Sequence, residues 1–404
     1  MNLNKEVLQS FIHNPFPYLE QFSQGNNVQW VHLFNTSGWL VTGYKEVETV
    51  LKDGRFMKEI RNLLPPDQIF TPPAHLMPAV MTVRNMMLFK DAPDHTRLRS
   101  LVTKAFTPRM VEKLRPTIKS LASYLMEQRR GKEQHEIIHD FAYLLPVMVI
   151  AELIGVEKED RDQFRIWSEA FIKFIDFNTT AEEWEAAAPH VEEANNYFRE
   201  LIKKRRLEPA NDLLSGLITA EEAGDKLTEQ EIISTCLLLL IAGHETTVNL
   251  ITNGYYQLLK HQDQYEKVRE DRSLLSNLVE ETLRYDPPVL LTSRWVGEDM
   301  NLFGVEMEKA QMAFVVLGAA NRDPAVVERP HEFDIIRSTI KHLSFASGPH
   351  FCLGAPLARL EAEIAFETLL DHFHQPELME EPTRRANVAF RGFETLKVKA
   401  EVKI

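Results

Sequence analysis

The sequence predicts a mainly α-helical protein with small β-sheets, folded as a single domain over residues 1–404. Apolar residues recur at helical spacing through most of residues 94–285 and again over 353–373. Alternating apolar and polar residues, typical of strands, occupy about 28–42 and about 386–400. No Gly-, Ser- or Pro-rich linker, internal repeat or low-complexity tract divides the chain, which favours one domain.

Composition narrows the functional classes. The formal net charge of −13 argues against nucleic acid as a partner, because phosphate binding needs a basic surface. Two cysteines are too few for a disulfide framework, which favours a reducing cytoplasm. Met1–Ser10 lacks the apolar core of a signal peptide. The apolar runs Phe141–Ala151 and Cys236–Ala242 are shorter than the roughly 20 residues that cross a bilayer, so we expect a soluble protein with no membrane segment.

Short elements are expected before the helical region. Val28–Thr42 holds a polar turn with a glycine between two apolar segments, which predicts a β-hairpin. Tyr44–Lys52 has the spacing of an amphipathic helix. Residues 61–93 are rich in Pro and Met without periodicity, which predicts a loop. This loop is either a plain surface connection or the wall of a ligand pocket, and the flexible thioethers of Met86 and Met87 favour the wall.

A helix is expected to open at Asp94, and helical patterns dominate residues 113–204. His95 and Arg99 are four residues apart, so they share one helical face and offer two donors to an anionic group. On its own, such a pair is more often an ordinary solvated basic face. Phe164–Phe177 is rich in aromatic residues, which alone predicts a helix packed on the core.

A polar cluster lies inside an apolar helix that is expected to start near Thr228. The run from Ala242 to Thr247 reads Ala-Gly-His-Glu-Thr-Thr. The carboxyl group of Glu245 and the hydroxyl group of Thr246 are costly to bury unless they have partners. Gly243 weakens the helix, and Thr246 can bond back to a carbonyl of the preceding turn, so a local opening is expected. A helix cap is the alternative, but the apolar pattern resumes beyond the cluster and indicates a continuous helix.

Further charged and apolar residues mark the C-terminal part. Glu281 and Arg284 are three apart on an expected helix and can pair, although most such pairs are worth less than about 1 kcal/mol. The apolar residues Leu290 and Leu291 precede Arg294, which alone reads as an edge-strand charge. Other expected elements are a short strand at Met312–Leu317 and a strand tip at Phe390.

The most specific motif runs over Phe345–Arg359 and reads Phe-Ala-Ser-Gly-Pro-His-Phe-Cys-Leu-Gly-Ala-Pro-Leu-Ala-Arg. Cys352 lies where a turn-rich loop gives way to an amphipathic helix. Unpaired backbone N–H groups and the helix dipole favour a thiolate there, the form of cysteine that binds soft metals. Gly348 and Gly354 flank the cysteine and allow close approach of a flat group. Taken alone, a lone cysteine is more often a buried structural residue.

These motifs, in this order, closely resemble those of the cytochrome P450 monooxygenases. Phe-x-x-Gly-x-His-x-Cys-x-Gly followed by Leu-Ala-Arg is similar to the haem-binding loop of the family, with Ala346 where the family often has glycine. Ala-Gly-x-Glu-Thr-Thr is similar to the oxygen-binding helix, and Glu281-Thr-Leu-Arg284 to the Glu-x-x-Arg signature. Their joint occurrence in family order leaves little room for coincidence.

The resemblance implies the cytochrome P450 fold and haem b (protoporphyrin IX iron), with Cys352 as the metal ligand. It implies that Thr246 and Glu245 form the catalytic pair, which relays protons. The residues implied to bind the cofactor are Cys352, His95, Arg99, Arg294, His350, Phe345, Gly348, Ala242, Gly243 and Gly354. The residues implied to line the substrate pocket are Met86, Met87, Leu238, Leu290, Leu291 and Phe390.

Two structural features also follow from the resemblance. Glu281 and Arg284 are implied to be structural and to brace the cysteine loop. The usual third member of their network is an arginine two residues after a proline, but Glu332 occupies that position after Pro330, so the arginine is absent there. Phe164–Phe177 is implied to form a mobile lid over the substrate channel.

The implied reaction is hydroxylation or epoxidation of a hydrophobic small molecule with dioxygen and two electrons. Expected substrates are polyketides or macrolides, terpenoids and fatty acids of secondary metabolism. No flavin or nicotinamide motif is present, so the electrons are expected from a ferredoxin or flavodoxin with its reductase, and the enzyme is expected to be a cytoplasmic monomer. A peroxygenase of the same fold and a non-catalytic haem-thiolate sensor or carrier are the alternatives. Peroxygenases tend to replace the acid and the threonine, and both are retained here.

Overall fold

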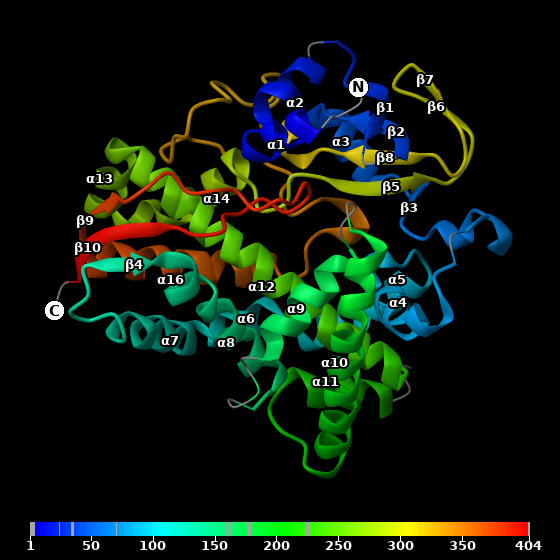
Figure 1. Ribbon diagram of the computed structural model, residues 1–404, viewed down its shortest axis with the longest axis horizontal. Coiled ribbons are helices and arrows are strands. Elements are labelled where there is room, and N and C mark those ends of the chain that lie inside the picture. Colours follow the sequence, from blue (N-terminus) through cyan, green and yellow to red (C-terminus); the bar gives the residue numbers. More distant parts are fainter. Residues whose placement is uncertain are drawn as a thin grey trace. The chain divides into compact units, whose positions relative to one another are not determined.

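The computed structural model describes residues 5–23, 25–33, 36–69, 71–157, 160, 163–175, 179–222 and 227–402 (Figure 1). The chain groups into two compact units, each built from separate stretches of sequence. Unit 1 comprises Met1–Phe56, Leu114–Leu145 and Thr246–Ile404, and unit 2 comprises Met57–Lys113 and Pro146–Glu245. The expected single domain stays a prediction.

A five-stranded sheet combines strands from the first stretch of unit 1 with strands from its last stretch, Thr246–Ile404. Its strand order is β1 (Val28–Leu33), β2 (Thr36–Val41), β8 (Met312–Val315), β5 (Thr292–Val296) and β3 (Phe56–Met57) (Figure 1). β1 and β2 pair antiparallel, with Val28 opposite Val41, which confirms the predicted hairpin. β2 pairs parallel with β8, and a Cβ at Gly38 would come within 2.6 Å of the Met312 carbonyl oxygen, so this pairing requires glycine.

The core of this sheet is formed by buried aliphatic side chains that include Val41, Val296 and Val315. Helix α3 (Tyr44–Lys52) has the predicted bounds, and its buried Val47 packs into the same cluster. Burial of one such side chain contributes about 1.5–3 kcal/mol. The period of this helix therefore fixes which of its faces meets the sheet.

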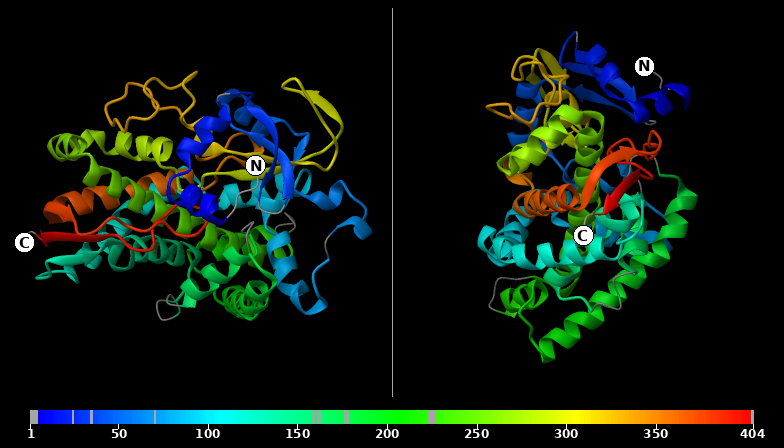
Figure 2. Two further views of the ribbon diagram at one scale, coloured as in Figure 1. Left: turned by 45° about the horizontal axis from the view of Figure 1, so that its top comes forward. Right: turned by 90° about the vertical axis from the view of Figure 1, so that its left-hand side faces the viewer.

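A second, three-stranded sheet joins distant parts of unit 1. Its order is β4 (Gln134–Glu136), β10 (Lys397–Val402) and β9 (Phe373–Leu378), and red β10 lies beside orange-red β9 in Figure 2. The strand predicted over about 386–400 is only partly right. β10 begins at Lys397, and Phe390 forms only an isolated bridge with Val289. Local alternation reports the side-chain pattern and not whether a partner strand is within reach.

The helices of unit 1 pack around α16 (Ala355–His372), which contacts both α7 (Arg115–Glu127) and α14 (Leu275–Tyr285). α16 buries apolar residues at helical spacing, including Leu357, Leu360 and Ile364, as the sequence predicts. The other elements of unit 1 are α1 (Lys5–His13), α2 (Phe16–Ser23), a π-helical turn (Ile138–Ala142), α13 (Gln262–Glu270), β6 (Met300–Leu302), β7 (Val305–Met307) and α15 (Leu317–Ala320).

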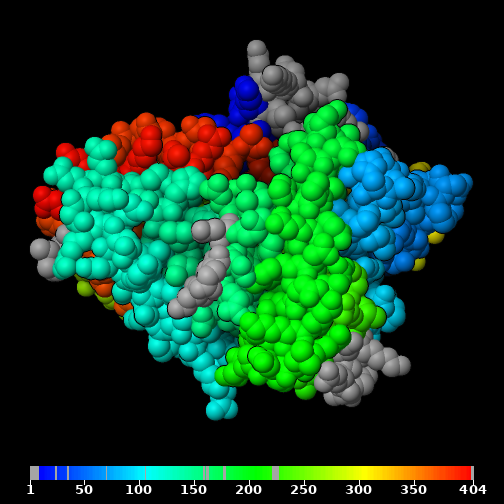
Figure 3. Space-filling view, turned by 60° about the horizontal axis from the view of Figure 1, so that its bottom comes forward, coloured from blue at the N-terminus to red at the C-terminus, as the bar shows by residue number. Residues whose placement is uncertain are grey.

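Unit 2 is helical. Its elements are α4 (Met77–Arg84), α5 (Asp94–Ala105), α6 (Pro108–Lys113), α9 (Gln163–Lys173), α10 (Ala181–Leu207) and α11 (Leu213–Glu222). α10 contacts α4, α9 and α11, and Figure 3 shows its green surface against the blue residues that precede α5. A capping box starts α10, because Thr180 Oγ1 accepts from the Glu183 N–H at 3.3 Å and the Glu183 carboxylate accepts from the Thr180 N–H at 2.9 Å.

The loop predicted over residues 61–93 is wrong in part, because it contains α4 and several short 3₁₀ helices. Pro78 lies in the first turn of α4, where its missing N–H costs nothing, although in the sequence it resembles a helix breaker. In the aromatic segment, Trp167 and Phe171 are buried on α9, in keeping with a packed helix. Phe177 lies outside the described residues. The short 3₁₀ helices around α4 span Ile60–Asn62, Pro66–Gln68, Ala74–Leu76 and Met87–Phe89.

Helix α12 (Glu229–Lys260) belongs to both units, and α8 (Leu144–Ile154) also crosses from one to the other. Thr228 and Glu231 cap the start of α12 with reciprocal bonds of 2.7 and 3.2 Å, close to the predicted start. The helix continues through Gly243 without a break, so the predicted continuity is confirmed and the expected local opening does not interrupt it. α12 is long and apolar enough to cross a bilayer, but 78% of its apolar window is buried, as in the core helix of a globular protein.

Candidate functional site

Cys352 lies in the turn between the 3₁₀ helix Gly348–His350 and the N-terminus of α16. Its backbone N–H donates to the carbonyl oxygen of Phe345 at 2.8 Å. Its side chain is half-buried and is not in a disulfide. Gly354 is the N-cap of α16, and Pro356 lies in the first turn. The predicted position of Cys352 beside a helix N-terminus is therefore confirmed.

Two residues of this loop have positive φ angles. Gly348 has φ 68°, and a Cβ there would come within 2.6 Å of the Leu51 carbonyl oxygen, so only glycine fits. Ala346 has φ 58°, a left-handed conformation that costs a residue with a side chain roughly 1–2 kcal/mol. This strain explains why glycine suits the position of Ala346. The surrounding structure must hold the loop against it.

A buried ion network on α14 provides such support. The Nε and Nη2 atoms of Arg284 donate to the two carboxylate oxygens of Glu281, each at 2.7 Å, and both side chains are fully buried. Arg337 Nε donates to Glu281 Oε1 at 3.1 Å, and the Arg337 side chain is 7% exposed. The arginine that is absent at position 332 is thus replaced by Arg337. The third member of the network, which the sequence left open, is therefore Arg337.

The remaining donors of the two arginines hold the backbone of a loop. Arg284 donates to the carbonyl oxygens of Pro330 and Glu332, each at 2.8 Å, and Arg337 donates to Arg329 at 2.7 Å and Glu332 at 2.9 Å. Buried charges offset their desolvation only when such donors find acceptors. Sequence spacing carries no signal for Arg337, because it meets Glu281 only through the path of this loop.

Asn321 links the ion network to the cysteine loop. Its carbonyl oxygen accepts from Arg284 at 3.3 Å, and its side-chain Oδ1 accepts from the Leu343 N–H at 2.7 Å. Its Nδ2 donates to Ser344 Oγ at 2.7 Å. Leu343 and Ser344 directly precede Phe345, whose carbonyl oxygen holds the N–H of Cys352. A continuous set of hydrogen bonds therefore runs from Glu281 to the cysteine, and sequence reasoning missed Asn321.

A second cluster holds the ring of Phe345, which is 9% exposed. Arg359 Nε donates to Glu280 Oε1 at 2.6 Å, and His342 Nε2 lies 3.0 Å from Glu280 Oε2. The Arg359 guanidinium lies 4.5 Å from the centroid of the Phe345 ring. Burial alone would raise the pKa of Glu280, but hydrogen bonds from His342 and Arg359 outweigh it and lower the pKa to about 2. Glu280 is therefore ionised at neutral pH and fixes Arg359 over the ring.

Two further predicted cofactor residues of unit 1 are His350 and Arg294. His350 ends the 3₁₀ helix before Cys352 and is half-buried. Arg294 lies in β5, is only 2% exposed and donates to the Ser293 carbonyl oxygen at 2.8 Å. A guanidinium this deeply buried needs acceptors for its five N–H groups, so the edge-strand alternative is excluded.

The predicted catalytic pair lies in the middle of α12. Glu245 is 7% exposed and His244 is 2% exposed, whereas Thr246 is half-buried. Ala242 is exposed although α12 is otherwise mostly buried, and it shares a helical face with Thr246 four residues later. Gly243 is half-buried beside Ala242. This face presents small side chains and one hydroxyl group.

The predicted cofactor and pocket residues of unit 2 lie mostly inside it. On α5, His95 is 4% exposed and Arg99 is half-buried. Met86 and Met87 are buried, and Leu238 on α12 is 5% exposed. Burial of His95 disfavours the alternative of a plain solvated face.

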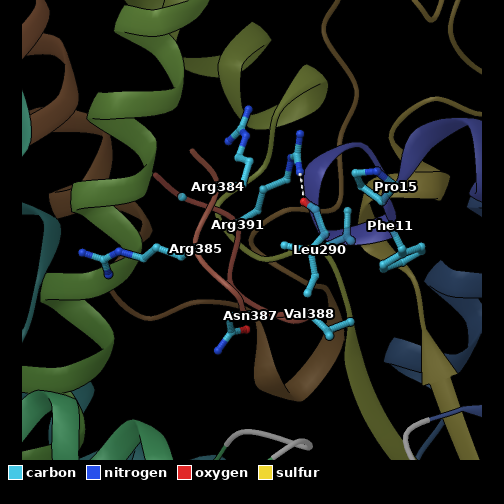
Figure 4. Close-up of a pocket in the computed structure, with 10 residues that line it drawn as sticks. Phe11, Pro15, Leu290, Arg384, Arg385, Asn387, Val388 and Arg391 are labelled. Carbon is cyan, nitrogen blue, oxygen red and sulfur yellow. Dashed lines mark hydrogen bonds between the residues drawn. The ribbon is translucent and has the colours of Figure 1, made fainter. Parts of the chain in front are cut away.

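Leu290 lines a cavity of about 10 Å³, the space of a single water molecule, together with Phe11, Pro15 and Arg391 (Figure 4). A Cβ on Gly318 would come within 2.4 Å of its Cδ1 atom. This side chain therefore packs among terminal segments of unit 1, which does not favour a role in a substrate pocket. Of the other predicted pocket residues in this unit, Leu291 is buried and Phe390 is half-buried.

Two arginines that line the small cavity beside Leu290 form a buried charge cluster at this corner of unit 1. Arg384 and Arg391 each donate to the buried Asp286 at 2.6 Å, and Arg391 also donates to the Ile12 carbonyl oxygen at 3.3 Å (Figure 4). Burial would raise the pKa of Asp286, but the two guanidinium groups hold it well below its usual range. The corner is a structural charge cluster.

The donor chemistry of the Cys352 loop fits an iron porphyrin. Across the described ranges, no group of three His, Cys, Asp or Glu side chains comes together as a protein-only metal site. Cys352 instead offers one sulfur, and a Cβ added at the neighbouring Gly354 would lie no closer than 3.9 Å to it, so the space beside the sulfur is open. Such a ligand suits a metal whose other ligands are supplied by a porphyrin.

Comparison with known proteins agrees with this chemistry. A family model described as Cytochrome P450 matches residues 13–403. A biotin biosynthesis cytochrome P450 of Bacillus subtilis (strain 168) is 42% identical over 393 residues, which cover 97% of each chain. The polyketide biosynthesis cytochrome P450 PksS of the same organism is 41% identical over 398 residues, or 96% of each chain. The crystal structure of P450BioI in complex with hexadec-9Z-enoic acid ligated acyl carrier protein has a TM-score of 0.92 at 41% identity, covering 98% of this chain and 100% of that chain.

Proposed function

Since this chain belongs to the cytochrome P450 family of monooxygenases, which carry haem b, we propose that the sulfur of Cys352 is the protein ligand of the haem iron. The observation that carries the proposal is the position of this half-buried cysteine, which is not in a disulfide. Its backbone is bonded to Phe345, and it stands beside the N-terminus of α16. The positive end of the helix dipole favours an anionic sulfur there.

Other residues of both units are assigned to the cofactor by their chemistry. His95, Arg99, Arg294 and His350 are assigned to the propionate groups, and His95 and Arg294 are buried. A hydrogen bond from a guanidinium group to a carboxylate is charge-assisted and strong. Smaller or flat groups allow close approach of the ring. These are Phe345, Gly348, Gly354, Ala242 and Gly243.

Thr246 and Glu245 are assigned to proton transfer. The bound haem supplies the reductive activation of dioxygen and the transfer of one oxygen atom to a C–H or C=C bond. The Thr246 hydroxyl group both donates and accepts hydrogen bonds, so it can hold a water molecule that carries a proton. The Glu245 carboxylate is 7% exposed and can pass protons on from the neighbouring position of α12.

The substrate is proposed to be a hydrophobic small molecule of secondary metabolism, a class suggested by the polyketide biosynthesis relative. The apolar side chains assigned to it are Met86, Met87, Leu238, Leu291 and Phe390, and Leu290 is given a packing role instead. A ferredoxin or flavodoxin with its reductase delivers the electrons. The enzyme acts as a monomer in the cytoplasm.

The experiment that tests this function is oxygen-isotope labelling. Haem-loaded full-length protein, a surrogate ferredoxin and its reductase are incubated with polyketides, macrolides, terpenoids and fatty acids under ¹⁸O₂. The expected product contains one ¹⁸O atom. Equal rates with hydrogen peroxide alone would support a peroxygenase instead. If no compound shifts the haem spin state, a sensor or carrier is supported.

A pair of neighbouring threonines tests the proton pathway within the same assay. Thr246→Ala is expected to release several times more hydrogen peroxide per electron pair, because the hydroxyl that holds the proton-carrying water is lost. Thr247→Ala is the matched control, since Thr247 is 2% exposed and lies on a different face of α12. Unchanged coupling in Thr246→Ala would contradict the assignment.

A further inference from the structure

Unit 2 contains a cavity of about 250 Å³ that combines apolar walls with a cluster of charges. This volume is roughly 25 times that of the single-water cavity of unit 1, enough for part of an organic molecule. The walls come from α4, the segment before it, and the ends of α9 and α10. The lining residues without charge are Ile60, Val80, Val83, Phe89, Phe174, Ile175 and Trp184, and the charged ones are Lys58, Glu59, Arg61 and Arg84.

The walls of this cavity are well anchored. The buried Asn195 of α10 donates to Thr82 of α4 at 2.8 Å, two residues before Arg84. The rings of Phe174 and Trp184 stack with centroids 5.5 Å apart. Trp184 Nε1 also donates to the Lys173 carbonyl oxygen at 2.8 Å. The position of the last turn of α4 is therefore set by packing and by a buried hydrogen bond.

Arg84 differs from the charges around it because, in the part of the chain that the structure describes, it makes no hydrogen bond or ion pair. The nearby carboxylates are engaged elsewhere. Glu59 pairs with Arg61 and lies 3.7 Å from Lys90. Asp91 accepts the backbone N–H groups of Lys58 and Glu59, each at 2.8 Å.

The acids on the opposite wall are also engaged. Glu183 pairs with Lys173 at 2.6 Å, and Glu185 pairs with His75 at 2.8 Å. These two carboxylates flank Trp184, a residue of the lining, in the sequence. Neither supplies a counter-charge to Arg84.

The local charge is positive although the whole chain is strongly acidic. Among the described residues that line the cavity, three are cations, Lys58, Arg61 and Arg84, and one is an acid, Glu59, in a chain whose formal net charge is −13. Burial lowers the pKa of Arg84 and the like charge of Arg61 lowers it further, whereas the charge of Glu59 opposes this only in part. An anion in the cavity would relieve the repulsion between the two guanidinium groups.

We infer that this cavity binds the carboxylate of an amphipathic substrate, with Arg84 as its ion-pair partner and the apolar walls against the adjoining hydrocarbon. The inference rests on the proposed function and deepens it, because it names the substrate class as apolar carboxylic acids. Guanidinium is suited to this task, since its planar N–H groups bind both oxygens of a carboxylate. Arg84 is thus a specificity-determining residue.

The test compares dodecanoate with dodecanol, which has the same chain and no charge at neutral pH. Binding to haem-loaded, full-length protein is measured by isothermal titration calorimetry. The wild type is expected to bind dodecanoate about tenfold more tightly than dodecanol, and Arg84→Gln to reduce this preference to less than about twofold. Arg84→Lys keeps the charge and should retain part of the preference. Added salt should weaken binding of the acid alone, because mobile ions screen the pair.

Arg165→Gln is the matched control, because Arg165 lies on α9 of the same unit with a side chain that is 53% exposed. Equal affinity of the wild type for the acid and the alcohol would overturn the inference. Equal weakening of both ligands in Arg84→Gln, or the same loss of preference in Arg165→Gln, would also overturn it. The spectrum of the reduced carbon monoxide complex separates the two proposals. Thiolate ligation without acid preference rejects only the carboxylate site, and acid preference without thiolate ligation rejects only the proposed function.

Discussion

The arginines of α14 and α4 have opposite surroundings. In unit 1, Arg284 shares the buried carboxylate of Glu281 with Arg337, and the other donors of both arginines bind backbone carbonyl oxygens. In unit 2, Arg84 lines a cavity and makes no hydrogen bond or ion pair among the residues described, and the carboxylate in the same lining, Glu59, pairs with Arg61. A buried cation whose donors are filled maintains a fold, whereas a half-buried cation whose donors have no acceptor is suited to a ligand.

The largest expected effect on stability is at the buried network of Glu281, Arg284 and Arg337. Glu281→Gln removes the one carboxylate that neutralises Arg284 and Arg337, and loss of one partner from a buried ion pair typically costs about 3–5 kcal/mol. Urea unfolding of the haem-loaded protein measures the free energy of unfolding. Glu298→Gln is the control, because its side chain is 62% exposed and should change stability by less than about 0.5 kcal/mol. If Glu281→Gln loses less than about 1 kcal/mol of unfolding free energy, the buried network does not maintain the fold as described.

A smaller effect is expected from acid at the neighbouring residue Glu280. Its pKa is about 2 in the folded protein, against about 4.3 in an unfolded chain. A depressed carboxyl pKa contributes stability that is complete above about pH 4.5 and is lost as pH falls towards 2. The wild type should therefore exceed Glu280→Gln in stability by up to about 3 kcal/mol at neutral pH, with the gap closing below pH 4.5. A gap that is independent of pH would show that the ionised carboxylate does not stabilise the cluster.

The smallest effect on stability is expected at Arg84. Because no pair is broken, Arg84→Gln should change the free energy of unfolding by less than about 0.5 kcal/mol. Arg337→Gln makes the same chemical change in the buried network and should cost several times more. Equal losses in these two variants, measured by the same urea titration, would mean that Arg84 is a structural residue like Arg337.

Local patterns allow much of the fold to be predicted. The helix over Tyr44–Lys52 and the continuity of α12 follow from apolar spacing, and the predicted fold class is confirmed. The predictions fail where tertiary contacts decide. The segment over residues 61–93 is expected to be a loop because it is rich in Pro and Met without periodicity, but Pro78 lies in the first turn of α4, where proline is tolerated. The C-terminal alternation did not reveal that Phe390 meets only Val289 in an isolated bridge.

The site residues also divide into those that local sequence signals predict and those that only tertiary contacts reveal. The position of Cys352 at a helix start could be predicted because turn residues and helical spacing are local signals. Arg337 and Asn321 could not, since each reaches its partner through the path of a loop. Arg84 also carries no sequence signal. Its lack of a hydrogen-bond or ion-pair partner among the described residues is a property of its three-dimensional neighbours, and the resemblance to the family does not report it.

The most direct test of the account is the absorption spectrum of the reduced carbon monoxide complex, because its red-shifted band requires thiolate ligation of the haem iron. The account predicts this band in the wild type, its loss in Cys352→Ala, and its retention in Cys236→Ala. Cys236 is the matched control, since it is a fully buried free cysteine whose thiol pKa is raised by burial. Haem content and circular dichroism establish that each variant is folded and loaded. A red-shifted band that persists in folded, haem-loaded Cys352→Ala would contradict the central claim.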